Sequence, residues 1–374
     1  MRAAVFFSYR MSIRAWQQLG IYSREMRRYS LVSGERMDLM FVTYDREAPN
    51  AEGRGKSAFL FNRHGLPDLL YSFLAPVLHC RELRSADVFL IHQISGSWMA
   101  MLAKLVYRRP LVARVGYFLT ELLRASGKSW WIWKLAQVLE FCLTRFSDGM
   151  ICTAPPEGRM EIPSWQRLAV IPNGIDTGLF SPFPKEYGER EGLTFIYIGR
   201  LSPEKNLTNF FQALIGFNAR LILVGDGPDR PALAEMSARN GLHVDFRGIV
   251  PNEQIPEILN GADVFVLPSI SEGNPKALLE AMSCGLPVIS TRWNGADEII
   301  RHMQNGILCG TSADSIRSAL QTLSGDNALR RRLGQEARAT AMKDFDLERN
   351  AAREGQFIRE IAGRVPVAQV RGVP

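Results

Sequence analysis

The segment Glu272-Gly-Asn-Pro-Lys-Ala-Leu-Leu-Glu280-Ala-Met-Ser-Cys-Gly-Leu-Pro-Val288 carries two carboxylates eight residues apart at the start of a predicted helix. Asn274 is a favourable N-cap residue, and Pro275 suits the first helical position because an N–H there would have no helical partner. Gly285 can end the helix, and Pro287 prevents it from continuing.

Short apolar runs on both sides of this helix are typical of buried parallel strands. They are Val264–Leu267 and Val288–Ser290. Glu272 is therefore expected on a strand-to-helix loop, with Glu280 in the second helical turn. In an open α/β sheet such a loop lies at the carboxyl ends of the strands, where ligands bind. The free N–H groups of the helix attract anions, and a carboxylate beside them can hold sugar or ribose hydroxyls.

Strands alternate with helices twice along the 374 residues, which predicts two doubly wound parallel sheets of the α/β class. We expect a first domain at 1–171, a second at 172–346, a last helix at 347–362 and a loose tail at 363–374. The predicted strands are 3–8, 38–43, 59–61, 87–92, 111–115, 150–153 and 168–171, then 195–198, 221–224, 244–246, 264–267, 288–290 and 307–309.

The opening segment resembles the Glu-x7-Glu signature of retaining glycosyltransferases of the GT-B fold, closest to glycosyltransferase family 4 (group 1 glycosyl transferases). The resemblance implies two Rossmann-like domains facing a cleft, with the last helix crossing back onto the first domain. Other matching pieces occur in the expected order, and they are Val170-Ile-Pro-Asn-Gly-Ile-Asp176, Tyr197-Ile-Gly-Arg200-Leu-Ser-Pro-Glu-Lys205-Asn206, Val224-Gly-Asp-Gly-Pro228, Phe246-Arg-Gly248, Asn294-Gly-Ala-Asp-Glu298 and Asn305-Gly306.

Two cations in this pattern are expected to hold the donor diphosphate. By resemblance, Arg200 and Lys205 bind it and replace a metal ion. Arginine can hold phosphate bidentately, whereas lysine acts as a point charge. Outside the motif, both would be interpreted as solvated surface cations.

The same resemblance implies roles for Glu272, Glu280 and the N-terminus of the helix between them. Glu280 would accept hydrogen bonds from ribose hydroxyls, and Glu272 would face the transferred sugar. The alternatives are an ordinary surface residue for Glu280 and a capping group for Glu272. The backbone N–H groups expected to meet the sugar or the β-phosphate belong to Asn274, Lys276 and Ala277.

Two further loops give weaker signals. Arg247-Gly248 follows a predicted strand and is expected to place backbone against the nucleotide base. The Gly225-Asp-Gly227 loop is either a donor contact or only a tight strand-to-helix turn.

The first half departs from the family pattern. The family usually has a glycine-rich loop after its first strand, whereas this chain has Ser8-Tyr-Arg-Met-Ser-Ile-Arg14. The family often has a histidine where this chain has Arg114-Val-Gly-Tyr117. The cleft candidates on this side are Arg10, His92, Arg114 and Glu121, although a histidine at a strand end is more often structural.

The distribution of charged residues along the chain limits the classes of binding partner that we expect. Residues 1–165 hold 22 Lys and Arg against 14 Asp and Glu, a net charge of +8, and the remaining residues have a net charge of −1. This basic half fits an anionic membrane surface, a lipid phosphate or an acidic glycan, or simply a solvated basic face. Nucleic acid is not expected because no binding module is recognisable.

The membrane signals in the sequence are mixed. No apolar run reaches the roughly 20 residues of a membrane span, and no signal peptide is recognised. The five cysteines form no C-x-x-C motif, which suits a reducing cytoplasm. Trp130, Trp131, Trp133 and Lys134 fit either a membrane-dipping loop or core packing.

Asp344-Phe-Asp346 imitates the metal-binding Asp-x-Asp of the other large class of glycosyltransferases. That motif should follow a strand, whereas this one lies between two predicted helices. Asp346 is instead expected to be the N-cap of the last helix. The sequence therefore predicts no metal site.

Together these features predict a cytoplasmic, metal-independent, retaining glycosyltransferase of the hexosyltransferase kind, acting in surface polysaccharide biosynthesis. It would need no cofactor, because the nucleotide-diphosphate sugar donor is a substrate. The expected acceptor is a hydroxyl of a glycan or of a lipid-linked carrier, with peripheral placement at the inner face of the membrane as one option. The alternatives are a transfer-inactive nucleotide-sugar-binding partner protein and, with less support, a nucleotide-sugar epimerase.

Overall fold

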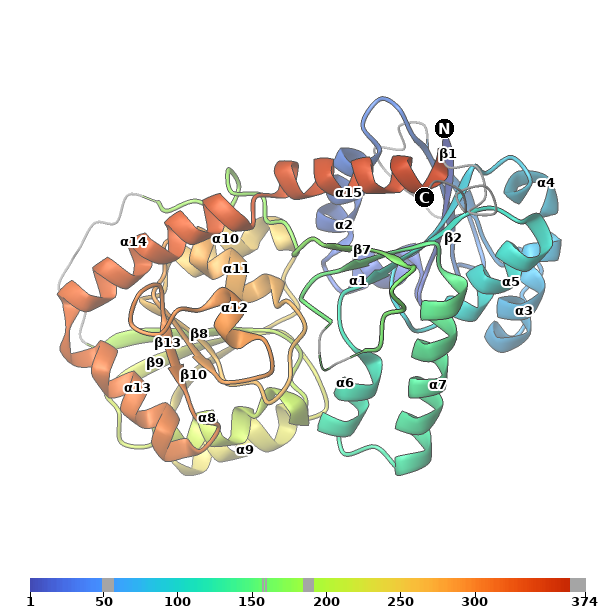
Figure 1. Ribbon diagram of the computed structural model, residues 1–374. Coiled ribbons are helices and arrows are strands. Elements are labelled where there is room, and N and C mark those ends of the chain that lie inside the picture. Colours follow the sequence, from blue (N-terminus) through green and yellow to red (C-terminus); the bar gives the residue numbers. More distant parts are fainter. Residues whose placement is uncertain (49–56, 157, 159, 184–191, 364–374) are drawn as a thin grey trace.

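The computed structural model describes residues 1–48, 57–156, 158, 160–183 and 192–363. It contains two α/β domains side by side, and a long helix runs from the second onto the first (Figure 1). The two doubly wound parallel sheets predicted from the sequence are confirmed.

The first domain is built on a seven-stranded, fully parallel sheet. Its strand order is β3-β2-β1-β4-β5-β6-β7, so the direction of winding changes between β1 and β4. Buried aliphatic and aromatic side chains fill both faces, as expected for a parallel sheet covered by helices. The strands are β1 (Arg2–Phe6), β2 (Asp38–Val42), β3 (Ala58–Leu60), β4 (Val88–Ile91), β5 (Leu111–Val115), β6 (Gly149–Cys152) and β7 (Arg167–Val170).

The helices of the first domain cover this sheet. They are α1 (Ile13–Gln18), α2 (Tyr22–Ser33), α3 (Asp68–Leu78), α4 (Cys80–Leu83), α5 (Ser97–Tyr107), α6 (Leu119–Ala125) and α7 (Trp130–Phe146). Helices α6 and α7 pack against each other as a hairpin that projects beside the second domain (Figure 1).

The second domain has a six-stranded parallel sheet in the order β10-β9-β8-β11-β12-β13. Numbered within the domain, this is 3-2-1-4-5-6, the order of a dinucleotide-binding Rossmann fold. Its direction of winding changes between β8 and β11, which pair directly. The strands are β8 (Leu193–Ile198), β9 (Ala219–Val224), β10 (His243–Gly248), β11 (Val264–Leu267), β12 (Val288–Thr291) and β13 (Ile307–Cys309).

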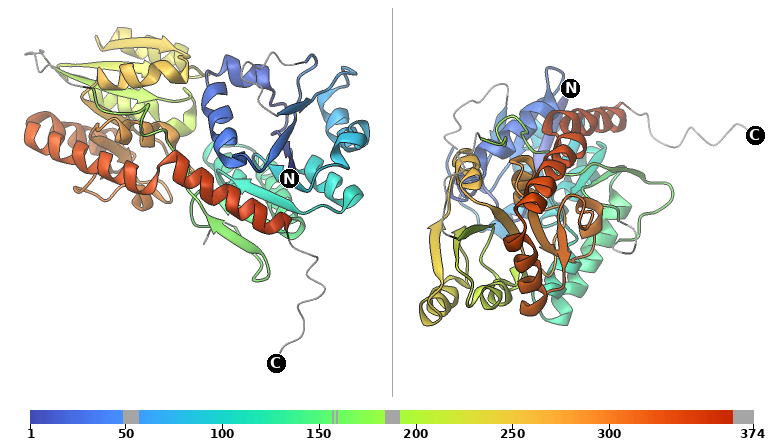
Figure 2. Two further views of the ribbon diagram at one scale, coloured as in Figure 1. Left: turned by 90° about the horizontal axis from the view of Figure 1, so that it is seen from above. Right: turned by 90° about the vertical axis from the view of Figure 1, so that its left-hand side faces the viewer.

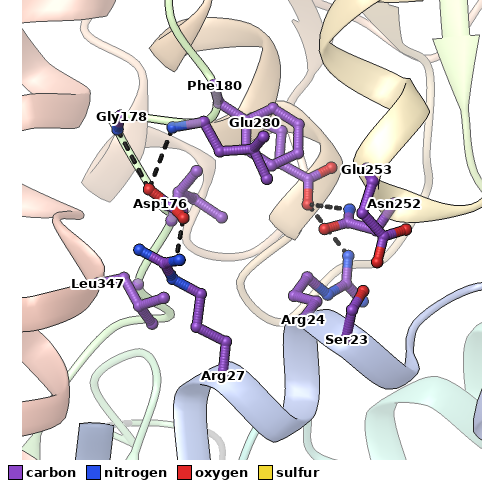
Figure 3. Close-up of a pocket in the computed structure, with 13 residues that line it drawn as sticks. Ser23, Arg24, Arg27, Asp176, Gly178, Phe180, Asn252, Glu253, Glu280 and Leu347 are labelled. Carbon is purple, nitrogen blue, oxygen red and sulfur yellow. Dashed lines mark hydrogen bonds and ion pairs between the residues drawn. The ribbon is translucent and has the colours of Figure 1, made fainter. Parts of the chain in front are cut away.

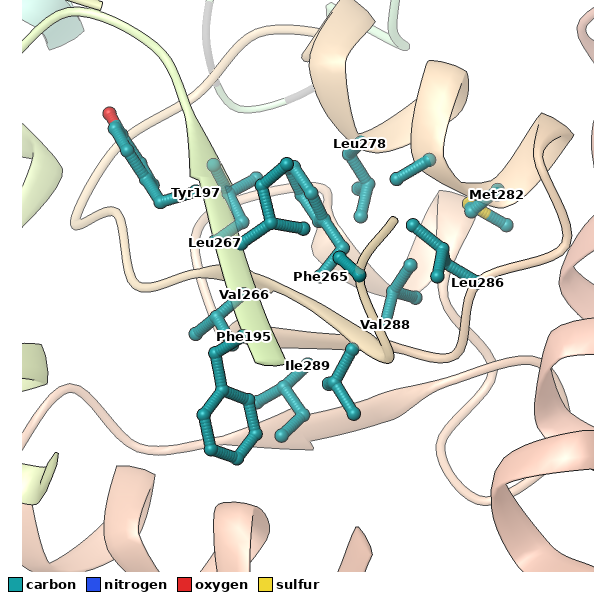
Figure 4. Packing of buried hydrophobic residues seen from close by; sticks show 14 of the residues in the cluster. Phe195, Tyr197, Phe265, Val266, Leu267, Leu278, Met282, Leu286, Val288 and Ile289 are labelled. Atoms are coloured by element: carbon teal, nitrogen blue, oxygen red, sulfur yellow. The ribbon is translucent and has the colours of Figure 1, made fainter. Parts of the chain in front are cut away.

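The core of the second domain fixes helix α11 against the sheet. Phe265 on β11 and Val288 on β12 are fully buried beside Leu278 and Met282 of α11 (Figure 4). The helices are α8 (Leu207–Leu214), α9 (Arg230–Arg239), α10 (Ile255–Asn260), α11 (Lys276–Ser283), α12 (Ala296–Ile299), α13 (Ala313–Gly325) and α14 (Asn327–Asp344), with 3₁₀ turns at Pro203–Lys205 and Asn252–Gln254.

Helix α15 (Leu347–Ala362) leaves the second domain and lies on the first (Figures 1 and 2). Phe357, Ile358 and Ile361 join the buried cluster beneath the first sheet. The Asp346 side chain accepts a hydrogen bond of 2.9 Å from the N–H of Arg349, which confirms its predicted role as N-cap. The predicted loose tail, apart from Gly363, lies outside the described residues.

A row of charged side chains on α2 faces the second half of the chain. Four of them bind four different partners. Arg24 binds Glu280 and Glu25 binds Lys276, both on α11, while Arg27 binds Asp176 in the linker and Arg28 binds Glu354 on α15. We call this row the α2 seam. It fixes the position of the second domain relative to the first.

The Gly225-Asp-Gly227 loop is a site of close backbone approach. A Cβ atom on Gly225 would lie 1.9 Å from the carbonyl oxygen of Gly199, and one on Gly227 would lie 2.2 Å from that of Leu201. Gly225 also has a φ of +125°, which L-residues rarely adopt. Packing therefore explains these glycines without a ligand.

We expect Gly225→Ala to destabilise the second domain by at least about 2 kcal/mol, because it adds overpacking to backbone strain. Calorimetric melting should show a loss of at least about 4 °C. The matched control is Gly325→Ala, since a Cβ there meets no atom within 4 Å. Equal melting temperatures for the two variants would contradict the packing explanation.

Candidate active site

A cavity of about 410 Å³ lies between the domains, where the winding of each sheet changes direction. Arg200 follows β8 and Glu272 follows β11, while His92 follows β4 of the other sheet. Ligands of doubly wound sheets bind at such positions. The predicted residues that line this cavity, which we call the cationic cavity, are Arg200, Lys205, Glu272, Asn274 and Lys276 from the second domain, with His92, Arg114 and Glu121 from the first.

Two of the residues that line the cationic cavity, Lys205 and Glu272, form an ion pair. Lys205 Nζ lies 2.7 Å from Glu272 Oε1, and Ser269 Oγ donates to the same oxygen at 2.7 Å. Arg200 is exposed, and its side chain makes no ion pair with any described residue. The 2.9 Å hydrogen bond from the Tyr197 hydroxyl to the Arg200 carbonyl fixes only its backbone. The charge of Lys205 is therefore paired with Glu272, whereas the positive charge of Arg200 has no ion-pair partner among the described residues.

Asn274 does not cap α11, contrary to the prediction. Helix α11 begins at Lys276 and Pro275 is its cap residue, with no side-chain capping bond. Asn274 instead binds the linker, because its side-chain Oδ1 accepts from the N–H of Asn173 at 2.9 Å and its backbone carbonyl accepts from Asn173 Nδ2 at 2.6 Å. Arg114 donates to Asn173 Oδ1 at 2.7 Å, so the loop before α11 is tied to the first sheet.

The start of α11 still offers donors. No described residue accepts a hydrogen bond from the backbone N–H of Lys276 or Ala277. Such free N–H groups at a helix N-terminus favour anions. Their contact with the sugar or the β-phosphate stays a prediction.

Glu280 is not an ordinary surface residue. Its side chain is 2% exposed and accepts hydrogen bonds from Arg24 Nη1 and Asn252 Nδ2, each at 3.1 Å. Glu280, Arg24 and Asn252 line a second cavity of about 610 Å³, which we call the Glu280 cavity (Figure 3). Arg24 lines both cavities, so its ion pair with Glu280 forms the partition between them.

Burial changes the acid–base properties of groups around Lys276. Burial lowers the pKa of Lys276 to about 8, although the adjacent Glu25 carboxylate acts in the opposite direction. Burial alone would raise the pKa of Glu25, but Lys276 and Arg24 outweigh it and hold this pKa well below its usual range. Burial also lowers the pKa of His92 to about 3, so its ring is neutral at pH 7. His92 is therefore a hydrogen-bonding group, with Nδ1 2.7 Å from the Tyr29 hydroxyl, and not a cation.

Some predicted residues lie elsewhere. Arg10 pairs with Asp68 at 3.3 Å and lines neither cavity. Arg247 pairs with Asp245 at 2.8 Å, and neither Arg247 nor Gly248 lines either cavity. Ala277 also lies outside both linings.

Sequence reasoning missed Arg24, Glu25 and Asn252. The charged run Arg24-Glu-Met-Arg-Arg28 could have drawn attention, because three of these residues fall on one side of a helix. The partners of Arg24 and Glu25 lie 256 and 251 residues away in the chain, and Asn252 binds Glu280, which is 28 residues away, so the pairs could not be read from the sequence.

Two Rossmann-like domains with a cavity at both switch points define the GT-B fold class. Sucrose-phosphate synthase from Thermosynechococcus elongatus has the same fold, with a TM-score of 0.81 at 20% identity over 96% of this chain and 99% of that one. Anabaena HepE, in its complex with UDP-glucose, aligns with a TM-score of 0.73 at 20% identity over 96% and 99% of the two chains.

The sequence of the second domain matches a known family. Residues 182–340 match the family described as Glycosyl transferases group 1. The UDP-Gal:alpha-D-GlcNAc-diphosphoundecaprenol alpha-1,3-galactosyltransferase of Escherichia coli is 34% identical over 181 residues, which are 44% of this chain and 46% of that protein. The chain spans about half the length of the first curated relatives it matches. The predicted resemblance is confirmed at this level.

The pKa of Lys276 predicts that anion binding weakens with rising pH. Lys276 is mostly protonated at pH 7 and mostly neutral at pH 9, so the affinity for inorganic pyrophosphate should fall as the pH passes through about 8. Calorimetric titration at both pH values measures this fall. Lys276→Arg is the matched control, because arginine stays charged and removes the step. The same fall in this variant would assign the effect to pyrophosphate or to another residue.

Proposed function

We propose that this protein is a retaining glycosyltransferase that moves a sugar from a nucleotide-diphosphate donor to a hydroxyl of a glycan or lipid-linked acceptor. The observation that carries the proposal is the gathering of Arg200, Lys205 and Glu272 at one switch point, with Glu280 directly behind them. The match of residues 182–340 to the group 1 glycosyl transferases supports it.

The proposed chemistry begins with the leaving diphosphate. Negative charge grows on the β-phosphate as its bond to the sugar breaks, so fixed cations stabilise the transition state more than the ground state. Arg200 and Lys205 would supply these cations without a metal ion, and the N–H groups at the start of α11 would add to them. In the retaining mechanism we propose, a donor phosphate oxygen helps to deprotonate the acceptor hydroxyl on the same face of the sugar.

A donor of this kind has to reach both cavities. Its diphosphate would meet Lys205 in the cationic cavity, and its ribose would meet Glu280 in the other cavity. Because the Arg24–Glu280 ion pair separates the two, the ribose hydroxyls would have to replace Arg24 on Glu280. The guanidinium released in this way would still lie beside Glu25, which is 3.5 Å away.

The acceptor proposal rests on relatives. The galactosyltransferase of E. coli is named for a diphosphoundecaprenol-linked substrate, which supports a lipid-linked acceptor and a role in surface polysaccharide biosynthesis. Such an acceptor would place this protein at an anionic membrane surface, peripheral to its inner face. Donor binding without turnover would instead identify a transfer-inactive nucleotide-sugar-binding protein, the alternative that the unusual Ser8–Arg14 loop keeps open.

The first test separates the two glutamates in steady-state kinetics. A thermal-shift screen of UDP- and GDP-sugars identifies the donor, since a ligand at about 100 times its Kd adds about 2.7 kcal/mol. Glu280→Gln should raise the donor KM roughly 10-fold, because the ribose is remote from the reacting bond. Glu272→Gln should lower kcat roughly 10²-fold or more, because its contacts change during the reaction.

Circular dichroism serves as the folding control for both variants. A kcat for Glu272→Gln close to that of the parent would remove this residue from the sugar site. Loss of parental activity with a chelator would refute the metal-free diphosphate clamp.

The second test examines the partition in binding experiments with UDP and uridine. Arg200→Ala should weaken the binding of UDP by about 1.5–3 kcal/mol and leave the binding of uridine nearly unchanged, because only UDP carries the phosphates. Arg24→Ala should raise the affinity for uridine about 3- to 10-fold, since the ribose no longer competes with Arg24 for Glu280. Weaker uridine binding to Arg24→Ala would show that Arg24 assists the nucleoside and does not compete with it.

A further inference from the structure

The outer side of the first domain exposes an unusual amount of apolar surface. Twelve of the 22 large hydrophobic residues that are exposed in the described chain lie on only three helices, α3, α5 and α7. The largest exposed fractions include 63% for Val77, 59% for Leu105, 70% for Trp130 and 64% for Leu135. Single exposed apolar residues need no explanation, but a concentration of this size marks an interaction site.

The three helices form one continuous face. Helix α5 lies between the other two and contacts both. The Tyr107 hydroxyl of α5 donates to the Pro76 carbonyl of α3 at 2.5 Å, and Lys104 Nζ donates to the Phe146 carbonyl of α7 at 2.7 Å. The ring of Phe73 on α3 also stacks on Trp98 of α5. We call this surface the α3–α5–α7 face.

The exposed residues follow helical spacing. On α3 the exposed positions are 69, 70, 73, 74 and 77, which lie on one side, while Tyr71 and Ala75 are buried on the other. Both sides of α3 are therefore apolar, whereas a helix on a solvated surface has a polar outer side. On α7, Trp130 and Trp131 lie in the first turn and are 70% and 58% exposed. Core packing, one of the two predicted alternatives for this stretch, is wrong for these two tryptophans, and they lie in a helix and not in a loop. The predicted contact with a membrane stays a prediction.

The charge around this face distinguishes the occupants that could cover it. The basic residues on and directly after the three helices are Lys104, Arg108, Arg109, Lys134 and Arg145, and the acidic ones are Asp68, Glu140 and Asp148, so this part of the chain has a net charge of +2. Lys134 and Arg145 stand on α7 among the exposed apolar residues, and Glu140 is buried beneath, where it binds Thr120. A second copy of the chain would bring the same positive charge to the contact. An anionic bilayer supplies the opposite charge together with an apolar interior.

We infer that the α3–α5–α7 face binds the surface of an anionic lipid bilayer, with its apolar side chains below the headgroups and its basic side chains among them. The aromatic residues at the start of α7 suit the interface between headgroups and acyl chains. None of the described helices is both long and apolar enough to cross a bilayer, so the contact is peripheral as far as these residues extend.

This face is connected to the candidate active site. Helix α6 packs along α7, and its residues Glu121 and Leu122 line the cationic cavity. A bilayer bound to α7 would therefore lie next to the acceptor side of the cavity. This step rests on the proposed function, because it explains how the hydroxyl of a lipid-linked acceptor reaches the donor. The binding of the bilayer itself does not depend on it.

Vesicle sedimentation with the full chain tests the inference, without donor or acceptor. The parent protein should sediment with phosphatidylcholine vesicles that contain 30% phosphatidylglycerol, and much less with phosphatidylcholine alone. The variant Trp131→Gln/Leu135→Gln should reduce the bound fraction at least 10-fold. Trp165→Gln is the matched control, since Trp165 is exposed to the same 58% as Trp131 but lies outside the three helices. It should bind like the parent.

The remaining outcomes each decide against part of the inference. No sedimentation of the parent at low salt, or equal loss in the control variant, would overturn the α3–α5–α7 face as a lipid-binding surface. Equal binding to neutral vesicles would overturn the anionic preference. A dimer in light scattering that the double variant abolishes would assign the face to a second copy. UDP binding, measured on the same variants, should stay within 2-fold of the parent, so a failure of donor binding is recognised separately.

Discussion

The α2 seam is the interaction on which the geometry of the site depends. Its four charged residues bind four partners in three parts of the second half of the chain, two on α11, one in the linker and one on α15. Removing one member of such a buried pair leaves an uncompensated charge, which is costly in a weakly polar interior. The seam therefore sets the distance and angle between the two sheets, and with them the width of the cationic cavity.

The seam includes two residues to which the proposed function assigns ligand contacts. Glu280 and Lys276 lie on α11, and both are bound to α2 in this structure. An anionic ligand with hydroxyl groups offers both residues new partners, because hydroxyls can bind the carboxylate and phosphates can bind the ammonium. The contact between the domains and the proposed ligand contacts thus involve the same side chains. The hydrogen bonds between Asn173 and Asn274 tie the loop before α11 to the linker independently of these side chains.

The two domains present chemically different groups at their surfaces. The second domain gathers cations and free N–H groups at its switch point, as a phosphate site requires. The first domain contributes neutral His92 and buried Arg114 to the cavity wall, and carries its exposed apolar face on the opposite side of the α6–α7 hairpin. A protein with this distribution can hold a charged donor in one domain and meet an apolar surface with the other.

The sequence alone determined the elements of both sheets and the positions of Arg200 and Glu272 in the loops after β8 and β11, with Lys205 just before the next helix. These features depend on hydrophobic periodicity and on turn residues close together in the chain. It also determined the capping role of Asp346, because that bond spans only three residues. The predicted capping role of Asn274 was wrong, since its side-chain amide binds Asn173, 101 residues away, and not the adjacent helix. Only the tertiary structure decided the pairing of Arg24 with Glu280, the partition between the two cavities and the exposure of α3, α5 and α7. Each of these depends on which surfaces meet when the domains pack, and the local pattern of a helix does not reveal its neighbour.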